Sequence, residues 1–186
     1  MKLPIYIYGH PVLRKKCKII DSSYPDLDNL ITNMFDTMSG ARGVGLAAPQ
    51  VGLAIKLFLI DIHFIDEENN DEVFKFKRIC INPEIIEKKE TLQVRESEGC
   101  LSIPSLTGDV NRSNYIKVTY LDQNFKKCTE VLRGFSARVF QHEYDHLKGV
   151  LFIDYLSNEK RKMMKKKLKN IEKGKFEQLY PIVLKK

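Results

Sequence analysis

The sequence lacks the features that mark secreted, disulfide-stapled or membrane-spanning proteins. Its four cysteines (Cys17, Cys80, Cys100 and Cys128) form no C-x-x-C pair, and nowhere do eighteen apolar residues run together. The residues before His10 include neither the apolar stretch of a signal peptide nor an Arg/Ser-rich transit segment. These absences favour a cytoplasmic location, where a functional cysteine acts as a ligand or nucleophile and not as half of a disulfide.

The sequence also lacks internal repeats and low-complexity linkers. Its 186 residues are 43% hydrophobic and 30% charged, which suffices for one domain with a core, so we expect a single domain over 1–186. The formal charge of +7 is distributed unevenly along the chain. Residues 156–186 carry eleven basic and three acidic side chains (+8), whereas residues 1–155 carry 20 and 21 (−1). This segment, 156–186, is expected to form a basic C-terminal helical extension, in which Met164, Leu168 and Ile171 form an apolar stripe that Leu156 and Met163 extend.

Hydrophobic periodicity predicts an α+β fold. Apolar spacing indicates one helix over 26–38 and another over 136–148, and a hairpin with a solvated acidic tip is expected over 62–76. Further short apolar or β-branched runs predict strands over 56–61, 78–81, 91–95, 115–121 and 129–132. We therefore expect antiparallel or mixed sheets around a central helix, with an N-terminal helix and a basic C-terminal helix.

The second predicted helix carries the pattern H-E-x-x-H, as His142-Glu143-Tyr144-Asp145-His146. Two imidazoles four residues apart share one helix face and can bind one metal ion, and the glutamate can reach a water on that ion. The alternative is a solvated helix with two hydrogen-bonded histidines.

The third ligand decides which kind of metal site this is. A metzincin needs a third histidine where this chain has Phe152, and the downstream carboxylates lie too close or inside the basic segment. The ligand is therefore expected upstream, among His10, His63 and the four cysteines. Cys100 has the surroundings of a site because it follows Gly99, where the backbone can turn; Cys17 is expected at the surface. A Cys-His-His set leaves a fourth position open and suits zinc as well as iron.

Three segments together resemble the motifs of the peptide deformylase family, in the same order. They are 43–50 (GVGLAAPQ), 98–102 (EGCLS) and 141–146 (QHEYDH), and the likeness extends from about residue 6 to 156. The resemblance implies a metallohydrolase that removes the formyl group from the N-terminal formyl-methionine of new proteins and releases formate. It implies one divalent ion, usually Fe²⁺, with Zn²⁺, Ni²⁺ or Co²⁺ as alternatives in a purified sample.

The resemblance also implies roles for particular residues. Metal-bound hydroxide would attack the formyl carbon with Glu143 as general acid and base. The metal ligands would be Cys100, His142 and His146, and the other catalytic groups Gln50, the Leu101 N–H and Gly45. For the substrate, the glycines would let the backbone pair with an extended peptide, and apolar neighbours would surround the methionine. These substrate-binding candidates are Gly43, Val44, Gly45, Phe135 and Val139, for whose apolar members core packing is the alternative.

The expected partners are formyl-methionyl nascent peptides and, through the basic helix, the ribosome; neither a membrane nor DNA is expected. A solvated helix is the alternative for the basic segment. Two other functions stay open from the residues alone: a metallopeptidase, on the H-E-x-x-H pattern, and a non-enzymatic RNA-binding protein, on the basic segment.

Overall fold

A computed structural model describes residues 1–65 and 72–185 of the chain. The acidic tip expected at 66–71 lies outside these residues. Within residues 1–65 and 72–185 the three α-helices are α1 (Leu27–Gly40), α2 (Gly134–His146) and α3 (Asn158–Glu172). The strands are β1 (Ile5–Tyr6), β2 (Gly45–Ala47), β3 (Leu57–Ile65), β4 (Glu72–Lys88), β5 (Gln93–Cys100), β6 (Ile103–Ser113), β7 (Tyr115–Leu121), β8 (Lys127–Arg133) and β9 (Ile182–Val183).

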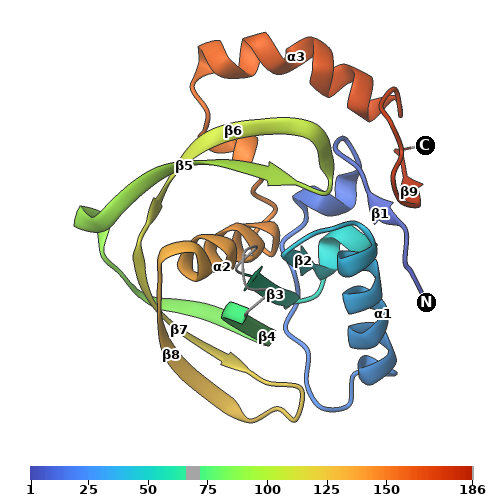
Figure 1. Cartoon of the computed structure of the whole chain (residues 1–186). Coiled ribbons are helices and arrows are strands. Elements are labelled where there is room, and N and C mark those ends of the chain that lie inside the picture. Colours follow the sequence, from blue (N-terminus) through green and yellow to red (C-terminus); the bar gives the residue numbers. More distant parts are fainter. Residues whose placement is uncertain (66–71, 186) are drawn as a thin grey trace.

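In the part of the chain that the structure describes, three sheets surround helix α2 (Figure 1). The largest is antiparallel with the strand order β2-β3-β4-β7-β8, so β2 is an edge strand. Strands β5 and β6 form a long antiparallel hairpin that curves over the opposite side of α2, and β1 pairs with β9 in parallel. This arrangement confirms the expected α+β class with antiparallel sheets around a central helix, and the parallel β1–β9 pair forms a sheet of its own.

Burial explains why α2 occupies the centre. Ala137 and Phe140 are fully buried against the large sheet, where the ring of Phe140 meets Phe58 of β3 edge to face. The helix ends at His146, and in the turn that follows Gly149 adopts a φ of +74°, where a Cβ would lie 2.6 Å from the carbonyl oxygen of Arg14. A side chain is therefore excluded at this turn.

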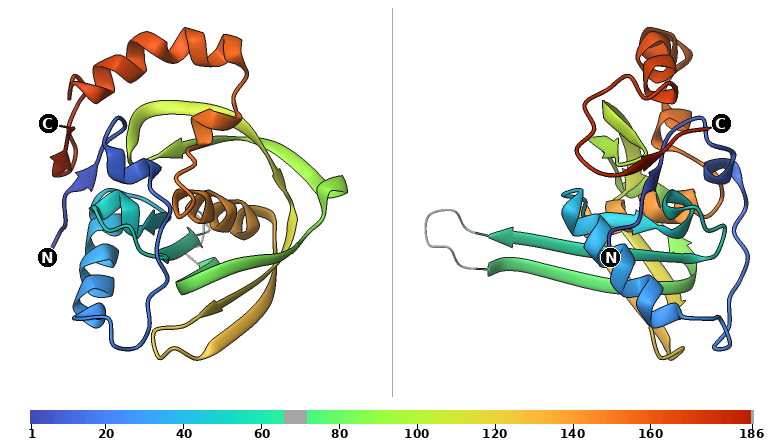
Figure 2. Two further views of the ribbon diagram at one scale, coloured as in Figure 1. Left: turned by 180° about the vertical axis from the view of Figure 1, so that it is seen from behind. Right: turned by 90° about the vertical axis from the view of Figure 1, so that its right-hand side faces the viewer.

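The predicted helices and the hairpin are confirmed within a few residues, since β3 and β4 pair in antiparallel register. Strand β6 was not predicted. Figure 2 shows strands β3 and β4 projecting together from the body. Among the described residues, no helix is both long and apolar enough to cross a bilayer.

Two expectations about the C-terminal segment need correction. Helix α3 ends at Glu172, and the chain then turns back to form β9 beside β1, so 156–186 is helical only in part (Figure 2). Met163 is 83% exposed and does not extend the apolar stripe, which consists of Leu168, Ile171 and the half-buried Met164. The expected surface position of Cys17 is also wrong, because its side chain packs in the core with Leu147.

Candidate active site

Helix α2 and the turn after β5 bring three metal-binding side chains together. His142 and His146 lie one turn apart on α2, and Cys100 is the last residue of β5. Their ligand atoms all lie within 4.8 Å of one another, with Cys100 Sγ 3.4 Å from His146 Nε2. The structure thus brings together the three ligands expected from the sequence.

The chemistry of these donors fits a divalent metal ion. His142 Nδ1 is 3.0 Å from the Glu98 carboxylate, which leaves Nε2 as the imidazole atom available for a metal. One sulfur and two imidazole nitrogens form a donor set suited to zinc or iron, with an open fourth position. Among the described residues, the buried Nδ1 of His146 has no hydrogen-bond partner.

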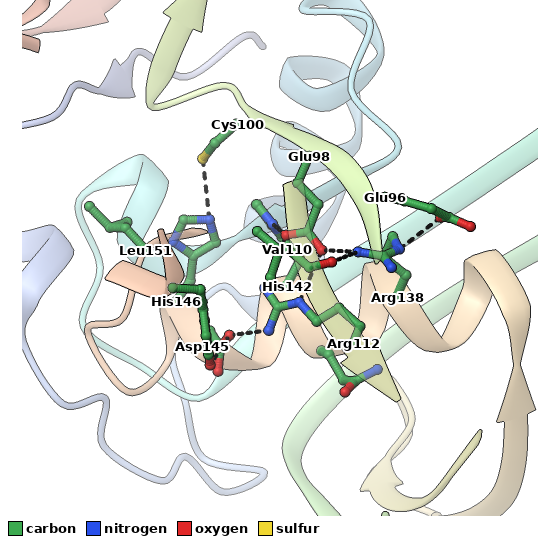
Figure 3. Close-up of polar contacts among 12 residues, drawn as sticks. Glu96, Glu98, Cys100, Val110, Arg112, Arg138, His142, Asp145, His146 and Leu151 are labelled. Carbon is green, nitrogen blue, oxygen red and sulfur yellow. Dashed lines mark hydrogen bonds and ion pairs between the residues drawn. The ribbon is translucent and has the colours of Figure 1, made fainter. Parts of the chain in front are cut away.

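A buried ionic network supports the ligands from the side of the β5–β6 hairpin (Figure 3). Glu98 accepts two hydrogen bonds of 3.0 Å from Arg112 and one of 2.7 Å from Arg138. Arg112 also donates to Asp145, on the next turn of α2 after His142. Glu98, Arg112, Arg138 and Asp145 are all buried, so their charges compensate one another and hold the helix against the hairpin.

The network fixes the ionisation state of Glu98. Burial alone would raise the pKa of this carboxyl, but hydrogen bonds from His142 and Arg112 outweigh burial and hold its pKa at about 2. The carboxylate therefore stays charged and can orient the His142 ring at neutral pH.

Glu143 is buried like Glu98, but its hydrogen bonding and its pKa differ from those of Glu98. Its side chain is only 4% exposed, and among the described residues its Oε2 atom has no hydrogen-bond partner. Burial raises its pKa to about 7, against the opposing charge of His142. Gly45 of β2 lies directly beside it, since a Cβ at this position would be 2.8 Å from Glu143 Cδ. The Glu143 carboxyl, with a pKa near neutrality, therefore lines the cleft beside Gly45, where it can accept a proton.

The side-chain amide of Gln50 points toward Cys100 and Ser102. It lies in a short 3-10 helix (Ala48–Val51), where its Oε1 accepts a hydrogen bond of 2.8 Å from the Ala47 N–H. Because the oxygen is occupied, the amide nitrogen faces Cys100 Sγ at 3.5 Å and Ser102 Oγ at 3.3 Å. The Leu101 N–H belongs to the same turn, so Gln50 and Leu101 flank Cys100.

A cleft of about 470 Å³ opens onto these groups. All five expected substrate-binding residues line it: Gly43, Val44, Gly45, Phe135 and Val139. Val44 and Phe135 are partly exposed, so core packing does not account for them, whereas Val139 is buried. Residues 177, 179 and 180 of the C-terminal segment also line the cleft, which the sequence did not indicate.

The remaining candidate ligands lie elsewhere. His10 accepts a hydrogen bond from the Val12 N–H, and His63 on β3 is 2.6 Å from Asp61. Arg138 was missed by the sequence reasoning, although its position four residues before His142 places it on the same helix face.

A Cys-His-His set beside a buried glutamate, at a cleft of about 470 Å³, is the arrangement of a metal-dependent hydrolase. The sequence model for polypeptide deformylase matches residues 2–162. The chain belongs to the polypeptide deformylase family, enzymes that remove the N-formyl group from nascent peptides with the help of a divalent metal.

Individual relatives agree with this assignment. The peptide deformylase of Christiangramia forsetii is 52% identical over 182 residues, covering 95% of this chain and 92% of the relative. The crystal structure of peptide deformylase from Ehrlichia chaffeensis matches with a TM-score of 0.82 at 31% identity, covering 94% and 98% of the two chains. A Met-Ala-Ser-bound peptide deformylase from Acinetobacter baumannii gives a TM-score of 0.76 at 31% identity, covering 84% and 99%. The resemblance noted in the three motifs is thereby confirmed.

Proposed function

We propose that Cys100, His142 and His146 hold the metal and that Glu143 moves the protons of formyl-methionine hydrolysis. The observation that carries this proposal is the buried carboxylate of Glu143, whose Oε2 has no hydrogen-bond partner within residues 1–65 and 72–185, next to three side chains whose ligand atoms converge. A bound divalent ion would polarise water and the formyl oxygen. Iron as that ion rests on the family resemblance, because the donor set suits zinc equally well.

Glu143 would serve as base and then as acid. It accepts a proton from the attacking water and delivers a proton to the methionine nitrogen as the bond from the formyl carbon to that nitrogen breaks. Formate and a free amine are the products. Its pKa of about 7 suits both steps, because an acid or base works best when its pKa lies near the working pH.

Gln50 and the Leu101 N–H would stabilise the negative charge that develops on the formyl oxygen. The Gln50 amide is oriented by its bond to Ala47, so little reorganisation is needed during the reaction. Loss of one such donor typically lowers kcat by about a hundredfold or more.

The substrate would lie along the free edge of β2. Gly43 and Gly45 leave room for an extended peptide to pair as an added strand, and Val44, Phe135 and Val139 would surround the methionine side chain. Binding of Met-Ala-Ser by the Acinetobacter baumannii relative supports a product of this kind.

The basic helix α3 would attach this single-domain enzyme to the ribosome in the cytoplasm, where its substrates are made. Leu168 and Ile171 pack on the body, so lysines such as Lys162, Lys166 and Lys169 face outward. Reversing these three charges should weaken ribosome binding in a salt-dependent way and leave hydrolysis of small peptides unchanged. Equal ribosome binding by the variant would refute this role.

Formate release from formyl-Met-Ala-Ser tests the proposed activity. The assay is run anaerobically with iron-loaded protein, because a thiolate-bound Fe²⁺ is sensitive to oxidation. We expect one formate per peptide and no cleavage of unformylated Met-Ala-Ser. Cleavage of internal peptide bonds would instead favour the metallopeptidase alternative.

A further inference from the structure

The C-terminal segment after α3, residues 174–183, returns to the body and borders the cleft. The Ile5 N–H donates to the Pro181 carbonyl at 2.8 Å, and the Ile7 N–H donates to the Val183 carbonyl at 3.0 Å. The segment is therefore anchored on β1 (Figure 1). Nothing in the proposed chemistry uses it.

Tyr180 connects this segment to the turn that follows Cys100. Its hydroxyl donates a hydrogen bond of 2.6 Å to the Leu101 carbonyl, one residue from Cys100. On the other side of the turn, the Tyr8 N–H donates to the Ser102 carbonyl at 2.8 Å. The turn that presents the Leu101 N–H is thus held between β1 and the C-terminal segment.

The direction of a bound peptide follows from burial along β2. Gly45 adjoins Glu143, which marks the reacting end. Beyond it Leu46, Ala47 and Ala48 are fully buried, so a peptide cannot continue that way, whereas Arg42 on the other side is exposed. Residues after the methionine must therefore leave past Gly43.

The wall opposite Gly43 is formed by Leu101 and the C-terminal segment. A Cβ on Gly43 would lie 2.8 Å from Leu101 Cδ1, and Tyr180 contacts the Leu101 carbonyl. Glu177 and Leu179 line the same cleft, and Leu179 is 74% exposed despite its apolar side chain. The second and third residues of a substrate would pass between these groups.

We propose that the C-terminal segment determines which residues are favoured after the formyl-methionine. Glu177 favours basic side chains at the second or third position, Leu179 offers them an apolar contact, and Tyr180 is a positioning residue for the Leu101 turn. This inference rests on the proposed function, because it assigns a substrate preference to the same site.

The test compares formyl-Met-Ala-Lys with formyl-Met-Ala-Glu, and formyl-Met-Lys-Ala with formyl-Met-Glu-Ala, as C-terminal amides. Wild-type protein should hydrolyse the lysine member of at least one pair with the higher kcat/KM. Glu177→Lys should lower that ratio by about three- to tenfold, because an exposed ion pair is replaced by a like-charge contact. Glu84→Lys is the matched control, since Glu84 is exposed on β4 and lies outside the cleft lining.

The dipeptide formyl-Met-Ala separates this inference from the proposed function. Used as its C-terminal amide, it carries no charge for residue 177 to attract or repel, so formate release from it reports that Glu177→Lys folds and keeps its metal. The preference itself is read from the lysine-to-glutamate ratio within each peptide pair, which a uniform loss of activity does not change. Unchanged ratios in both peptide pairs, with normal dipeptide hydrolysis, would overturn the inference and leave the deformylase activity standing. No formate from any peptide with the wild type would instead overturn the proposed function.

Tyr180→Phe gives a second readout. Loss of the hydrogen bond to Leu101 should lower kcat for the dipeptide by about three- to tenfold with little change in KM. A lowered melting temperature with unchanged kcat would show a structural role only and overturn the positioning role.

Discussion

Two buried glutamates, Glu98 on β5 and Glu143 on α2, differ in the hydrogen bonds that their carboxylates accept. Around Glu98, two arginines and His142 satisfy the buried carboxylate completely. Glu143 is equally buried, yet within the described part of the chain its Oε2 has no partner. The pKa values diverge accordingly, to about 2 for Glu98 and about 7 for Glu143. Two glutamates in one site thus suit different tasks, one for holding a ligand and one for exchanging protons.

The largest expected effect comes from removing a ligand. His146→Ala should lose stoichiometric metal and all measurable formate release, because two remaining donors bind a divalent ion weakly. His63→Ala is the matched control, since this histidine is exposed and bonded to Asp61. Elemental analysis and the formate assay distinguish the two variants. Wild-type metal content in His146→Ala would contradict the ligand assignment.

A methyl group beside Glu143 should damage the reaction without touching the metal. In Gly45→Ala the added carbon would displace the Glu143 carboxylate, and a misplacement of about 1 Å costs about a hundredfold in rate. Gly40→Ala is the control, because there a Cβ meets only the flexible end of Lys2. We expect kcat to fall in the first variant alone, at unchanged metal content. Equal rates would show that Gly45 does not position Glu143.

Breaking the supporting network should act on stability and metal affinity. Arg112→Met leaves Glu98 and Asp145 buried without this cation, which costs about 3–5 kcal/mol and weakens metal binding about 10- to 100-fold. Arg95→Met on the same hairpin breaks only an exposed pair with Asp109 and should cost under about 1 kcal/mol. Denaturant unfolding and competition with a chelator measure both quantities. Similar values for the two variants would refute a supporting role.

The smallest effect is expected at the rim of the network. Tyr155 donates a hydrogen bond of 2.9 Å to Asp145, so Tyr155→Phe should cost about 1 kcal/mol of unfolding free energy. Formate release should stay within about twofold of wild type. A fall in formate release well beyond twofold, with the unfolding free energy lowered by only about 1 kcal/mol, would show that the network affects the reacting groups.

The catalytic helix and its ligands could be predicted because their information is local. The H-E-x-x-H spacing places two candidate ligands on one helix face, and Gly99 precedes Cys100 where the β5–β6 pairing shifts register. The network could not be read in the same way, because Glu98, Arg112 and Asp145 are brought together only by the β5–β6 pairing across α2.

Strand β6 was missed because its buried positions are not all hydrophobic. Every second residue from Leu106 to Arg112 faces inward, but these include Gly108, which packs under Leu156, and the charged Arg112. The alternation is therefore invisible to a hydrophobicity pattern. Cys17 was misplaced for a related reason, because exposed lysines on both sides of it hide a single inward-facing position.

The different roles assigned to Glu98 and Glu143 are tested most directly by measuring the formate release and the metal content of Glu143→Gln. This variant keeps the size of the side chain and removes its ability to accept and return a proton. We predict stoichiometric metal, since the ligands and the Glu98 network are intact, and a kcat lowered by about a hundredfold to ten-thousandfold. Formate release within tenfold of the wild-type rate, at equal metal content, would contradict the assignment of proton transfer to Glu143.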